Sequence, residues 1–140
     1  MERMNENPSS QAQTHGKISD YVVMFLRMLT SAELEVRKEF FTPWIQEEAI
    51  DMGIYRQRRV DPMGEEADQL HITALVDAIG VGCRVEYLDG NGAGDHVDHH
   101  DFMPSSQQQQ QSEAAPTPAE PPIHLLYRPG HYDILNARID

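Results

Sequence analysis

The hydrophobic period changes once along this chain, between Ile79 and Cys83, and this change limits the folds that the chain can adopt. Before it, apolar side chains recur three and four residues apart, as on one face of an α-helix. After it, β-branched and aromatic residues alternate with polar ones, as in strands. Helices followed by strands predict an α+β fold, with N-terminal helices and a small antiparallel sheet.

The first helical segment carries one apolar stripe. Its members recur at helical spacing: Ile18, Tyr21, Val22, Phe25, Leu26 and Leu29. We expect Ser31 to cap a second helix, with Leu34 and the Phe40–Phe41 pair facing inward and Pro43 ending or redirecting it. The segment Trp44–Val60 also has helical character.

The sequence "DPMGEEADQLHITALVDAIG" predicts the clearest helix. Asp61 is a suitable N-cap, Pro62 a suitable first helical residue, and Gly80 can adopt the left-handed conformation that ends a helix. The predicted buried stripe consists of Ile72, Leu75 and Ile79. Three strands should follow, at Cys83–Leu88, at "IHLLYR" and at "HYDIL", the last two joined by a Pro-Gly turn.

Composition divides the chain into four parts. Residues 1–16 are polar and predict a flexible tail, and residues 17–103 hold the helices and the first strand. Residues 104–122 contain a glutamine run and "AAPTPAEPP", which predict a disordered insert within a long break from 89 to 122. Residues 123–135 hold the remaining strands.

Charge and cysteine content exclude several classes of function. The net charge of −12 argues against binding to nucleic acid or to an anionic membrane. The chain has one cysteine, Cys83, so it has no disulfide framework or multi-cysteine zinc site. Residues 1–16 lack the apolar core of a signal peptide, and no run of eighteen apolar residues is present. We therefore expect a cytoplasmic or nuclear protein.

His131 and Asp133 form the most chemically suggestive pair. On a strand, residues two apart face the same side, while Tyr132 between them faces the other. The carboxylate could then hold one ring nitrogen of the imidazole and leave the other free as a base. On spacing alone, such a short pattern is more often structural than catalytic.

Three other features have simpler structural interpretations. Cys83 could be a nucleophile, but its place in an apolar strand favours a buried packing role. The cluster "DHVDHHD", 95–101, could bind a metal ion, yet a solvated polar loop is the more common outcome. The basic run "RQRR", 56–59, favours salt bridges or a local protein contact, and His71 a hydrogen-bonded core position.

Four blocks of sequence resemble the C-terminal half of the otubains, ubiquitin-specific cysteine proteases of the ovarian-tumour (OTU) superfamily. They are "SDYVVMFLRMLTS", "VDPMGEEADQLHITALVDAIGV", "RVEYLD" and "LLYRPGHYDIL", and together they span roughly residues 18–135. The sequence of the second block is most similar to that of plant members. The resemblance implies an incomplete OTU, papain-like cysteine protease fold. It also implies that His131 is the general base and that Asp133 orients it.

The nucleophile of that family lies in an Asp-Gly-Asn-Cys loop before the first block, and no such loop is present here. "LDGNG" at 88–92 has glycine where the thiol would be and predicts a turn. We therefore expect a truncated form that is inactive alone, and that exposes apolar surface and self-associates or is of low stability. The alternative is an inactive module that binds ubiquitin or a ubiquitin-conjugating enzyme; a metal-binding regulatory protein is a third.

The resemblance implies ubiquitin or polyubiquitin as the partner, with a ubiquitin-conjugating enzyme as a further candidate. It implies neither a metal nor an organic cofactor.

Overall fold

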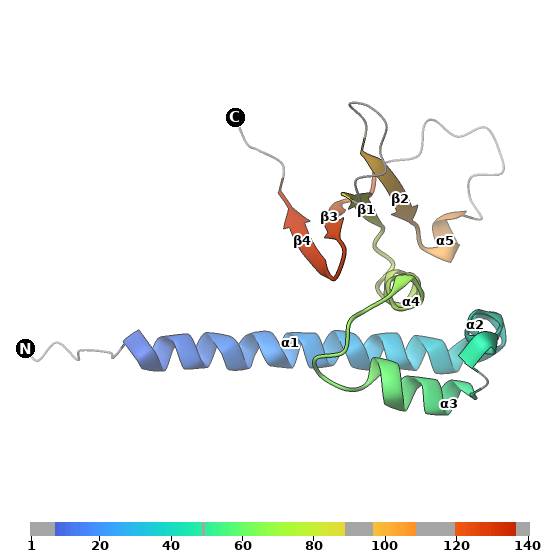
Figure 1. Ribbon diagram of the computed structural model, residues 1–140, viewed down its shortest axis with the longest axis horizontal. Coiled ribbons are helices and arrows are strands. Elements are labelled where there is room, and N and C mark those ends of the chain that lie inside the picture. Colours follow the sequence, from blue (N-terminus) through green and yellow to red (C-terminus); the bar gives the residue numbers. More distant parts are fainter. Residues whose placement is uncertain (1–7, 49, 89–96, 109–119, 137–140) are drawn as a thin grey trace, which may run out of the picture.

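The computed structural model describes residues 8–48, 50–88, 97–108 and 120–136. A long helix, α1 (Pro8–Val36), runs along one side of the molecule, and a four-stranded sheet lies on the other. Helix α4 (Gln69–Ile79) lies between them and contributes buried side chains to the cluster on each side (Figure 1). The α+β class predicted from the sequence is confirmed. Within the described residues, no helix is both long and apolar enough to cross a membrane.

Helix α1 is longer than predicted in both directions. It begins at Pro8, so residues 8–16, which were expected to belong to a flexible tail, are helical, while residues 1–7 lie outside the described part. It also continues through Ser31, which was predicted to cap a new helix. Ser31 is buried inside the helix, where its hydroxyl accepts a 2.8 Å hydrogen bond from Nε of Arg56. That bond satisfies the buried hydroxyl, so a polar residue can occupy this position.

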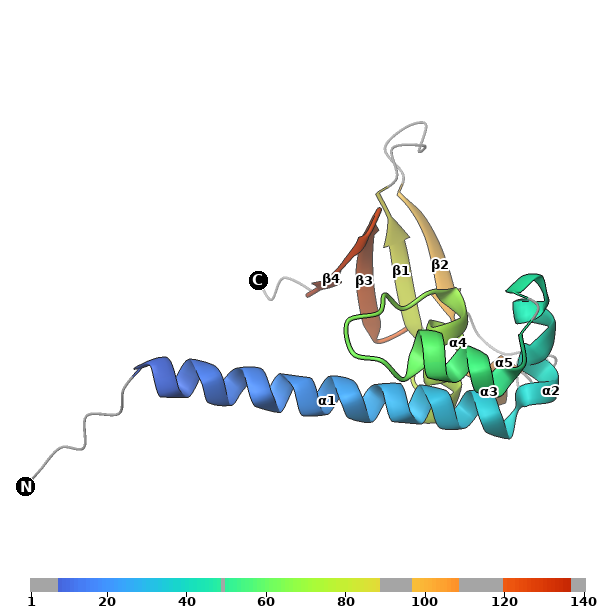
Figure 2. The ribbon, with the colours of Figure 1, turned by 60° about the horizontal axis from the view of Figure 1, so that its bottom comes forward.

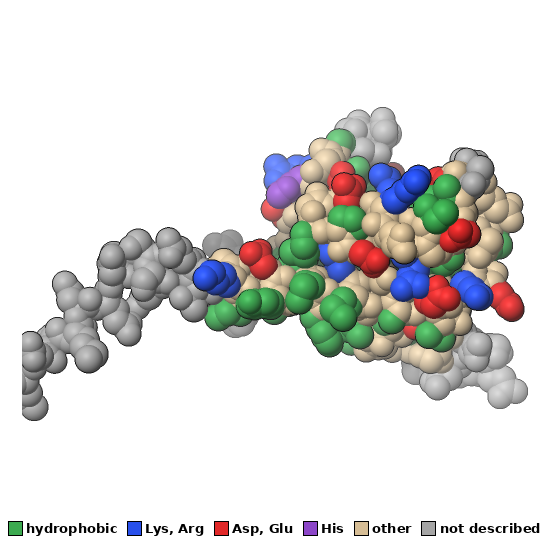
Figure 3. All heavy atoms as spheres, turned by 90° about the horizontal axis from the view of Figure 1, so that it is seen from below, with side chains coloured by type: hydrophobic (Ala, Val, Ile, Leu, Met, Phe, Trp, Pro, Cys, Tyr) green, Lys and Arg blue, Asp and Glu red, His purple; other side chains and the backbone are tan. Residues whose placement is uncertain are grey.

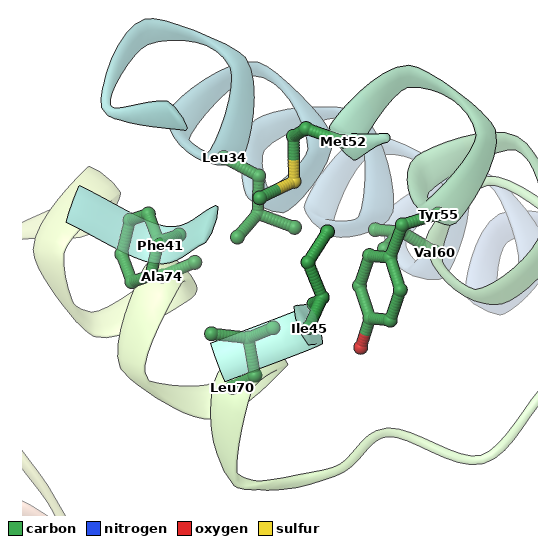
Figure 4. Close-up of a cluster of buried hydrophobic side chains, with 8 residues drawn as sticks. All are labelled: Leu34, Phe41, Ile45, Met52, Tyr55, Val60, Leu70 and Ala74. Carbon is green, nitrogen blue, oxygen red and sulfur yellow. The ribbon is translucent and has the colours of Figure 1, made fainter. Parts of the chain in front are cut away.

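Short helical segments follow α1 and close a core against it. They are α2 (Lys38–Phe41), the 3₁₀ helix η1 (Thr42–Glu48), α3 (Met52–Tyr55) and η2 (Arg56–Val60). Figure 4 shows the side chains of this core: Leu34, Phe41, Ile45, Met52, Tyr55, Val60, Leu70 and Ala74. Phe41 is fully buried as predicted, but its neighbour Phe40 is exposed, since adjacent helical residues point to different faces.

Helix α4 begins later than the sequence indicated. Its N-cap is Asp68, not Asp61, because the intervening Gly64 has a φ of 89°, which no right-handed helix allows. The Oδ1 atom of Asp68 accepts hydrogen bonds from the backbone N–H groups of Leu70 and His71, at 2.9 and 3.1 Å. The predicted end is confirmed: Gly80 is in the left-handed conformation with a φ of 69°.

The buried face of α4 also differs from the predicted stripe. The buried residues are Leu70, His71, Ala74 and Val76, whereas Ile72 and Leu75 are half-buried and Ile79 is exposed. The difference arises because α4 packs against helices on one side and against the sheet on the other. A single-stripe pattern describes a helix with one buried side.

The sheet consists of β1 (Cys83–Tyr87), β2 (Asp98–Phe102), β3 (Ile123–Arg128) and β4 (His131–Leu135), in the order β2-β1-β3-β4. The predicted strands β1, β3 and β4 are confirmed. The sheet is mixed rather than wholly antiparallel, since β1 pairs with β3 in parallel while the two outer pairs are antiparallel. Figure 2 shows the four strands side by side.

Strand β2 and the short helix α5 (Ser105–Gln108) lie where the sequence indicated an irregular break and insert. β2 is polar and forms one edge of the sheet, so no apolar alternation identifies it. Arg84 on β1 binds Asp101 of β2 through two hydrogen bonds, at 2.7 and 2.9 Å. Residues 109–119 of the predicted insert lie outside the described part.

Candidate catalytic pair

Strand β4 presents His131 and Asp133 on one face and Tyr132 on the other. Tyr132 is in register with Tyr127 of β3, which is in turn in register with Tyr87 of β1, so these three rings share the face that α4 covers. The ring centroids of Tyr127 and Tyr132 lie 4.8 Å apart. His131 and Asp133 therefore lie on the face that carries no helix among the described residues, and their side chains are 60% and 43% exposed.

The two side chains are joined by a hydrogen bond. Nε2 of His131 lies 2.9 Å from Oδ1 of Asp133. Hydrogen bonds from His131 and then from Arg128 lower the pKa of the Asp133 carboxyl, so at neutral pH this group is ionised and can only accept. The histidine must then donate from Nε2, which leaves the Nδ1 lone pair free to take a proton.

Arg128 is a member of this site that reasoning from the sequence missed. It is in register with His131 across the β3–β4 hairpin, and its guanidinium binds Oδ2 of Asp133 while His131 binds Oδ1. The carboxylate is thus held from both sides. The position of arginine immediately before the Pro-Gly turn was the available signal, because a tight hairpin places the residues that flank its turn opposite each other.

Cys83 lies far from this pair. It is buried with Val76 and Val85 on the α4 face of the sheet, opposite to the face that carries His131. Cys83 is in register with Ile123 at one end of β3, whereas His131 is in register with Arg128 at the other end. The two positions are therefore roughly 16 Å apart along the strand direction alone. Burial raises the pKa of the Cys83 thiol, and Asp101 raises it further. All of these features favour a packing role.

The His/Asp cluster is divided by the structure. Residues 95 and 96 lie outside the described part, and residues 98–101 belong to β2, where alternation sends Asp98 and His100 to one face and His99 and Asp101 to the other. The carboxylate of Asp101 binds Arg84, and the ring centroids of His100 and Phe102 lie 4.6 Å apart. Among the residues described, no group of three or more potential ligands is placed to hold a metal ion.

The basic run and His71 have the structural roles expected of them. In the basic run, Arg56 binds Ser31 and Glu35. A guanidinium nitrogen of Arg59 lies 4.0 Å from Oε2 of Glu65. His71 is buried and hydrogen-bonded to the hydroxyl of Tyr55 at 3.0 Å.

A hollow of about 340 Å³ lies on the α4 side of the sheet, on the opposite face from His131 and Asp133. Its lining combines three tyrosines with charged and polar residues: Arg59, Glu66, Ala67, Asp68, Gln69, Tyr87, Tyr127 and Tyr132. Burial, followed by the neighbouring tyrosines, raises the pKa of Tyr132 to about 12. Tyr132 is therefore neutral at physiological pH and does not serve as a base.

Comparison with known protein families shows which family this chain belongs to. The family model described as Peptidase C65 Otubain matches residues 2–137. The chain belongs to the otubain family. The family and the fold expected from the sequence are both confirmed. The resemblance of the second sequence block to plant members agrees with the plant relative described below.

Two curated relatives show how much of their own length this chain spans. An Arabidopsis thaliana protein, ovarian tumor domain-containing deubiquitinating enzyme 1, is 46% identical over 84% of this chain and 39% of its own length. Human ubiquitin thioesterase OTUB1 is 41% identical over 84% of this chain and 38% of its own length. The chain thus spans about two fifths of the length of these otubains.

Solved otubain structures share the same fold. A complex of ceOTUB1 with ubiquitin aldehyde and UBC13~Ub aligns with 86% of this chain and 44% of its own, with a TM-score of 0.72 and 33% identity. A second complex, h/ceOTUB1 with ubiquitin aldehyde and UBCH5B~Ub, aligns with 83% of this chain and 40% of its own, with a TM-score of 0.66 and 35% identity.

Proposed function

We propose that this chain is the part of an otubain-type deubiquitinase that carries the general base, with His131 as the base and Asp133 as the residue that orients it. The observation that carries the proposal is the 2.9 Å contact between Nε2 of His131 and Oδ1 of Asp133 on one face of β4. In a chain of this family, such a pair leaves Nδ1 directed away from the carboxylate and available for proton transfer.

The reaction is the cleavage of an isopeptide bond at the C-terminus of ubiquitin. A cysteine thiol gives its proton to Nδ1 of His131, and the thiolate attacks the carbonyl carbon of the terminal glycine, forming an S–C bond. The C–N bond to the lysine then breaks, and the imidazolium returns its proton to the departing amine. Asp133, whose carboxyl pKa is lowered by the hydrogen bonds from His131 and Arg128, stabilises the imidazolium, and water later hydrolyses the thioester.

The thiol in this reaction is not Cys83. That side chain is buried, has a raised pKa and lies on the other face of the sheet from His131. By resemblance to the family, the nucleophile belongs to an Asp-Gly-Asn-Cys loop before the first matching block. We therefore propose that this chain alone does not hydrolyse ubiquitin conjugates, since a base without its nucleophile supplies little of the rate enhancement.

We also propose that the protein is located in the cytosol or the nucleus. A chain with one cysteine has no disulfide framework, which is typical of proteins in these reducing compartments.

A second candidate is a module that binds ubiquitin or a ubiquitin-conjugating enzyme without catalysis. The observation that favours it is structural: the aligned otubains were solved in complexes with ubiquitin aldehyde and with UBC13~Ub or UBCH5B~Ub. The aligned region covers most of this chain, so it can retain part of such a surface.

A thiol-reactive ubiquitin probe tests the missing nucleophile. We expect no covalent adduct when the purified chain is mixed with ubiquitin that bears an electrophile at its C-terminus, and no change with Cys83→Ser. An adduct that depends on Cys83 would show that the nucleophile had been assigned wrongly.

A chimera tests the base. The nucleophile-bearing segment of the Arabidopsis relative, joined before this chain, should restore hydrolysis of ubiquitin conjugates. His131→Ala should then reduce the rate about 10²- to 10⁴-fold. The matched control is His99→Ala, which removes another exposed histidine from the same face of the sheet. Equal loss in both variants, or none in His131→Ala, would contradict the assignment. Binding of ubiquitin to the unmodified chain together with an inactive chimera would favour the second candidate.

A further inference from the structure

One face of the β3–β4 hairpin groups three side chains of complementary chemistry. Arg128 is in register with His131, and Leu126 is in register with Asp133, so the arginine and the aspartate are diagonal neighbours across the two strands. Such positions lie roughly 7–8 Å apart, within reach of a long side chain. The arginine spans this gap, since its guanidinium donates a hydrogen bond to Oδ2 of Asp133.

The ion pair between Arg128 and Asp133 contributes little to the stability of the fold. Its two side chains are 55% and 43% exposed, so water screens their attraction, and ordering both side chains costs conformational entropy. Acidic and basic side chains also gather at several other places on the surface, as Figure 3 shows for one face of the molecule. Fold stability therefore does not account for an arginine at this position.

The two oxygens of the Asp133 carboxylate have different partners. Oδ1 lies 2.9 Å from Nε2 of His131, whereas Oδ2 accepts the hydrogen bond from Arg128. The last torsion of an aspartate side chain is broad and two-fold, so an exposed carboxylate with one partner can rotate and exchange that partner for water. A second partner on the other oxygen restricts this rotation. The imidazole then has an acceptor in a constant position.

We propose that Arg128 is a positioning residue for the proton transfer: by binding Oδ2 of Asp133, it keeps Oδ1 directed at Nε2 of His131 and leaves Nδ1 as the basic nitrogen. This inference rests on the proposed function, in which His131 is the general base. Arg128 acts through Asp133, and the role requires no contact between the arginine and the thiol or the substrate.

The hairpin fixes the backbone on which this contact is built. Gly130 in the Pro-Gly turn has a φ of 78°, in the left-handed region that glycine adopts at little cost. On the other face of the hairpin, the ring centroids of Tyr127 and Tyr132 lie 4.8 Å apart, so the neighbours of Arg128 and His131 are packed. The arginine therefore has only its own side chain to order when it binds the carboxylate.

Charge and geometry predict opposite effects of removing Arg128. A carboxyl with an ordinary aspartate pKa, about 3.9, is already ionised at pH 7, so Asp133 keeps its charge there without the arginine. The positive charge of Arg128 opposes a second cation on the neighbouring imidazole. If charge dominated, removal of the arginine would help His131 to accept a proton. If positioning dominates, removal disturbs the orientation of His131 and slows the reaction.

A ¹⁵N NMR experiment on the purified chain tests the positioning. Arg128→Met keeps a long side chain without a donor, whereas Arg128→Lys keeps both the charge and a donor. We expect His131 to be a single Nε2–H tautomer in the wild type and in Arg128→Lys, and a mixture of tautomers in Arg128→Met. The matched control is Arg84→Met, which removes an arginine from Asp101 on the same face of the sheet and should leave the His131 signals unchanged.

Urea unfolding of the same variants separates positioning from a structural role. Arg128→Met should unfold at the wild-type midpoint, because the ion pair that it removes is exposed. A lowered midpoint in Arg128→Met would show a structural role and count against the proposal. A single tautomer in Arg128→Met, or a mixture of tautomers in Arg84→Met or in Arg128→Lys, would overturn it.

Kinetics of the chimera with the nucleophile-bearing segment of the Arabidopsis relative test the effect on the reaction. Arg128→Met should lower kcat about tenfold with KM unchanged, less than the roughly hundredfold loss that a misplacement of about 1 Å can cause, because Asp133 is still present to bind His131. Arg128→Lys should restore most of the rate. A higher kcat in Arg128→Met would show that charge dominates and would overturn the proposal.

His131→Ala in the same chimera distinguishes failure of this inference from failure of the proposed function. Full activity in His131→Ala would reject the base itself, and with it any role of Arg128 in the reaction. Loss of activity in His131→Ala together with an unchanged kcat in Arg128→Met would reject only the positioning role.

Discussion

The hydroxyl of Tyr55 lies 3.0 Å from Nε2 of His71, in the interior between α3 and α4. Nδ1 of the same ring accepts a 3.1 Å hydrogen bond from the backbone N–H of Asp68, so Nε2 carries the proton and donates to Tyr55. Tyr55 in turn lies 3.2 Å from Oδ2 of Asp68, to which it donates. Protonation of Nδ1 would set two donors against each other. Burial is the largest cause of the lowered pKa of His71. The charge of Asp68 raises this pKa, and the charges of Arg27 and Arg59 lower it further.

This network predicts that the free energy of unfolding decreases as the solution is acidified below about pH 6.5. In the unfolded chain His71 binds a proton near that pH, whereas in the folded protein it does so only at lower pH. Between the two pKa values the unfolded state holds more protons, so stability rises with pH in that window and is lost as the pH falls. Urea unfolding at pH 7.5 and pH 5.5 measures the difference.

Two variants separate His71 from the other histidines. His71→Gln should have a smaller change in unfolding free energy between these pH values, because glutamine does not titrate. His99→Gln replaces an exposed histidine and should retain the wild-type dependence. A wild-type protein equally stable at both pH values would refute the role of His71.

The second prediction concerns the tautomer of His131. Asp133→Asn replaces an ionised acceptor by an amide, so the imidazole loses the partner that keeps its proton on Nε2. We expect ¹⁵N NMR to show a mixture of tautomers for His131 in this variant and a single Nε2–H form in the wild type. Because both side chains are exposed, the stability should change by no more than about 0.5 kcal/mol. Asp98→Asn on β2 is the control; an unchanged His131 spectrum in Asp133→Asn would mean that the pair does not form in solution.

The third prediction compares two apolar residues on α1. Leu34 is fully buried in the helical core, whereas Val36, two residues later, is 79% exposed. Leu34→Ala should lower the free energy of unfolding by about 2–5 kcal/mol, because it removes buried methyl groups and leaves a cavity. Val36→Ala should change it by no more than about 0.5 kcal/mol. Denaturant unfolding gives both values, and similar losses in the two variants would contradict the position of Leu34 in the core.

The features that could be predicted from the sequence depend on local interactions. Alternation and a Pro-Gly turn were enough to place β3 and β4, and the period of two in a strand put His131 and Asp133 on one face. The left-handed glycine at the end of α4 was predictable for the same reason, since only glycine adopts that conformation at little cost. The catalytic interpretation of the pair came from resemblance to the otubains, because a short pattern does not distinguish a catalytic pair from a structural one.

Other features depended on contacts between residues far apart in the sequence. Arg56 satisfies the hydroxyl of Ser31, which is buried within α1, and polar β2 forms a strand because β1 supplies its hydrogen bonds. The parallel pairing of β1 with β3, and the burial of α4 on two sides, likewise follow from how the elements pack. Local pattern thus determined where most elements lie and which side chains share a face. Tertiary packing decided which of those faces are buried, because burial depends on the element that covers each face.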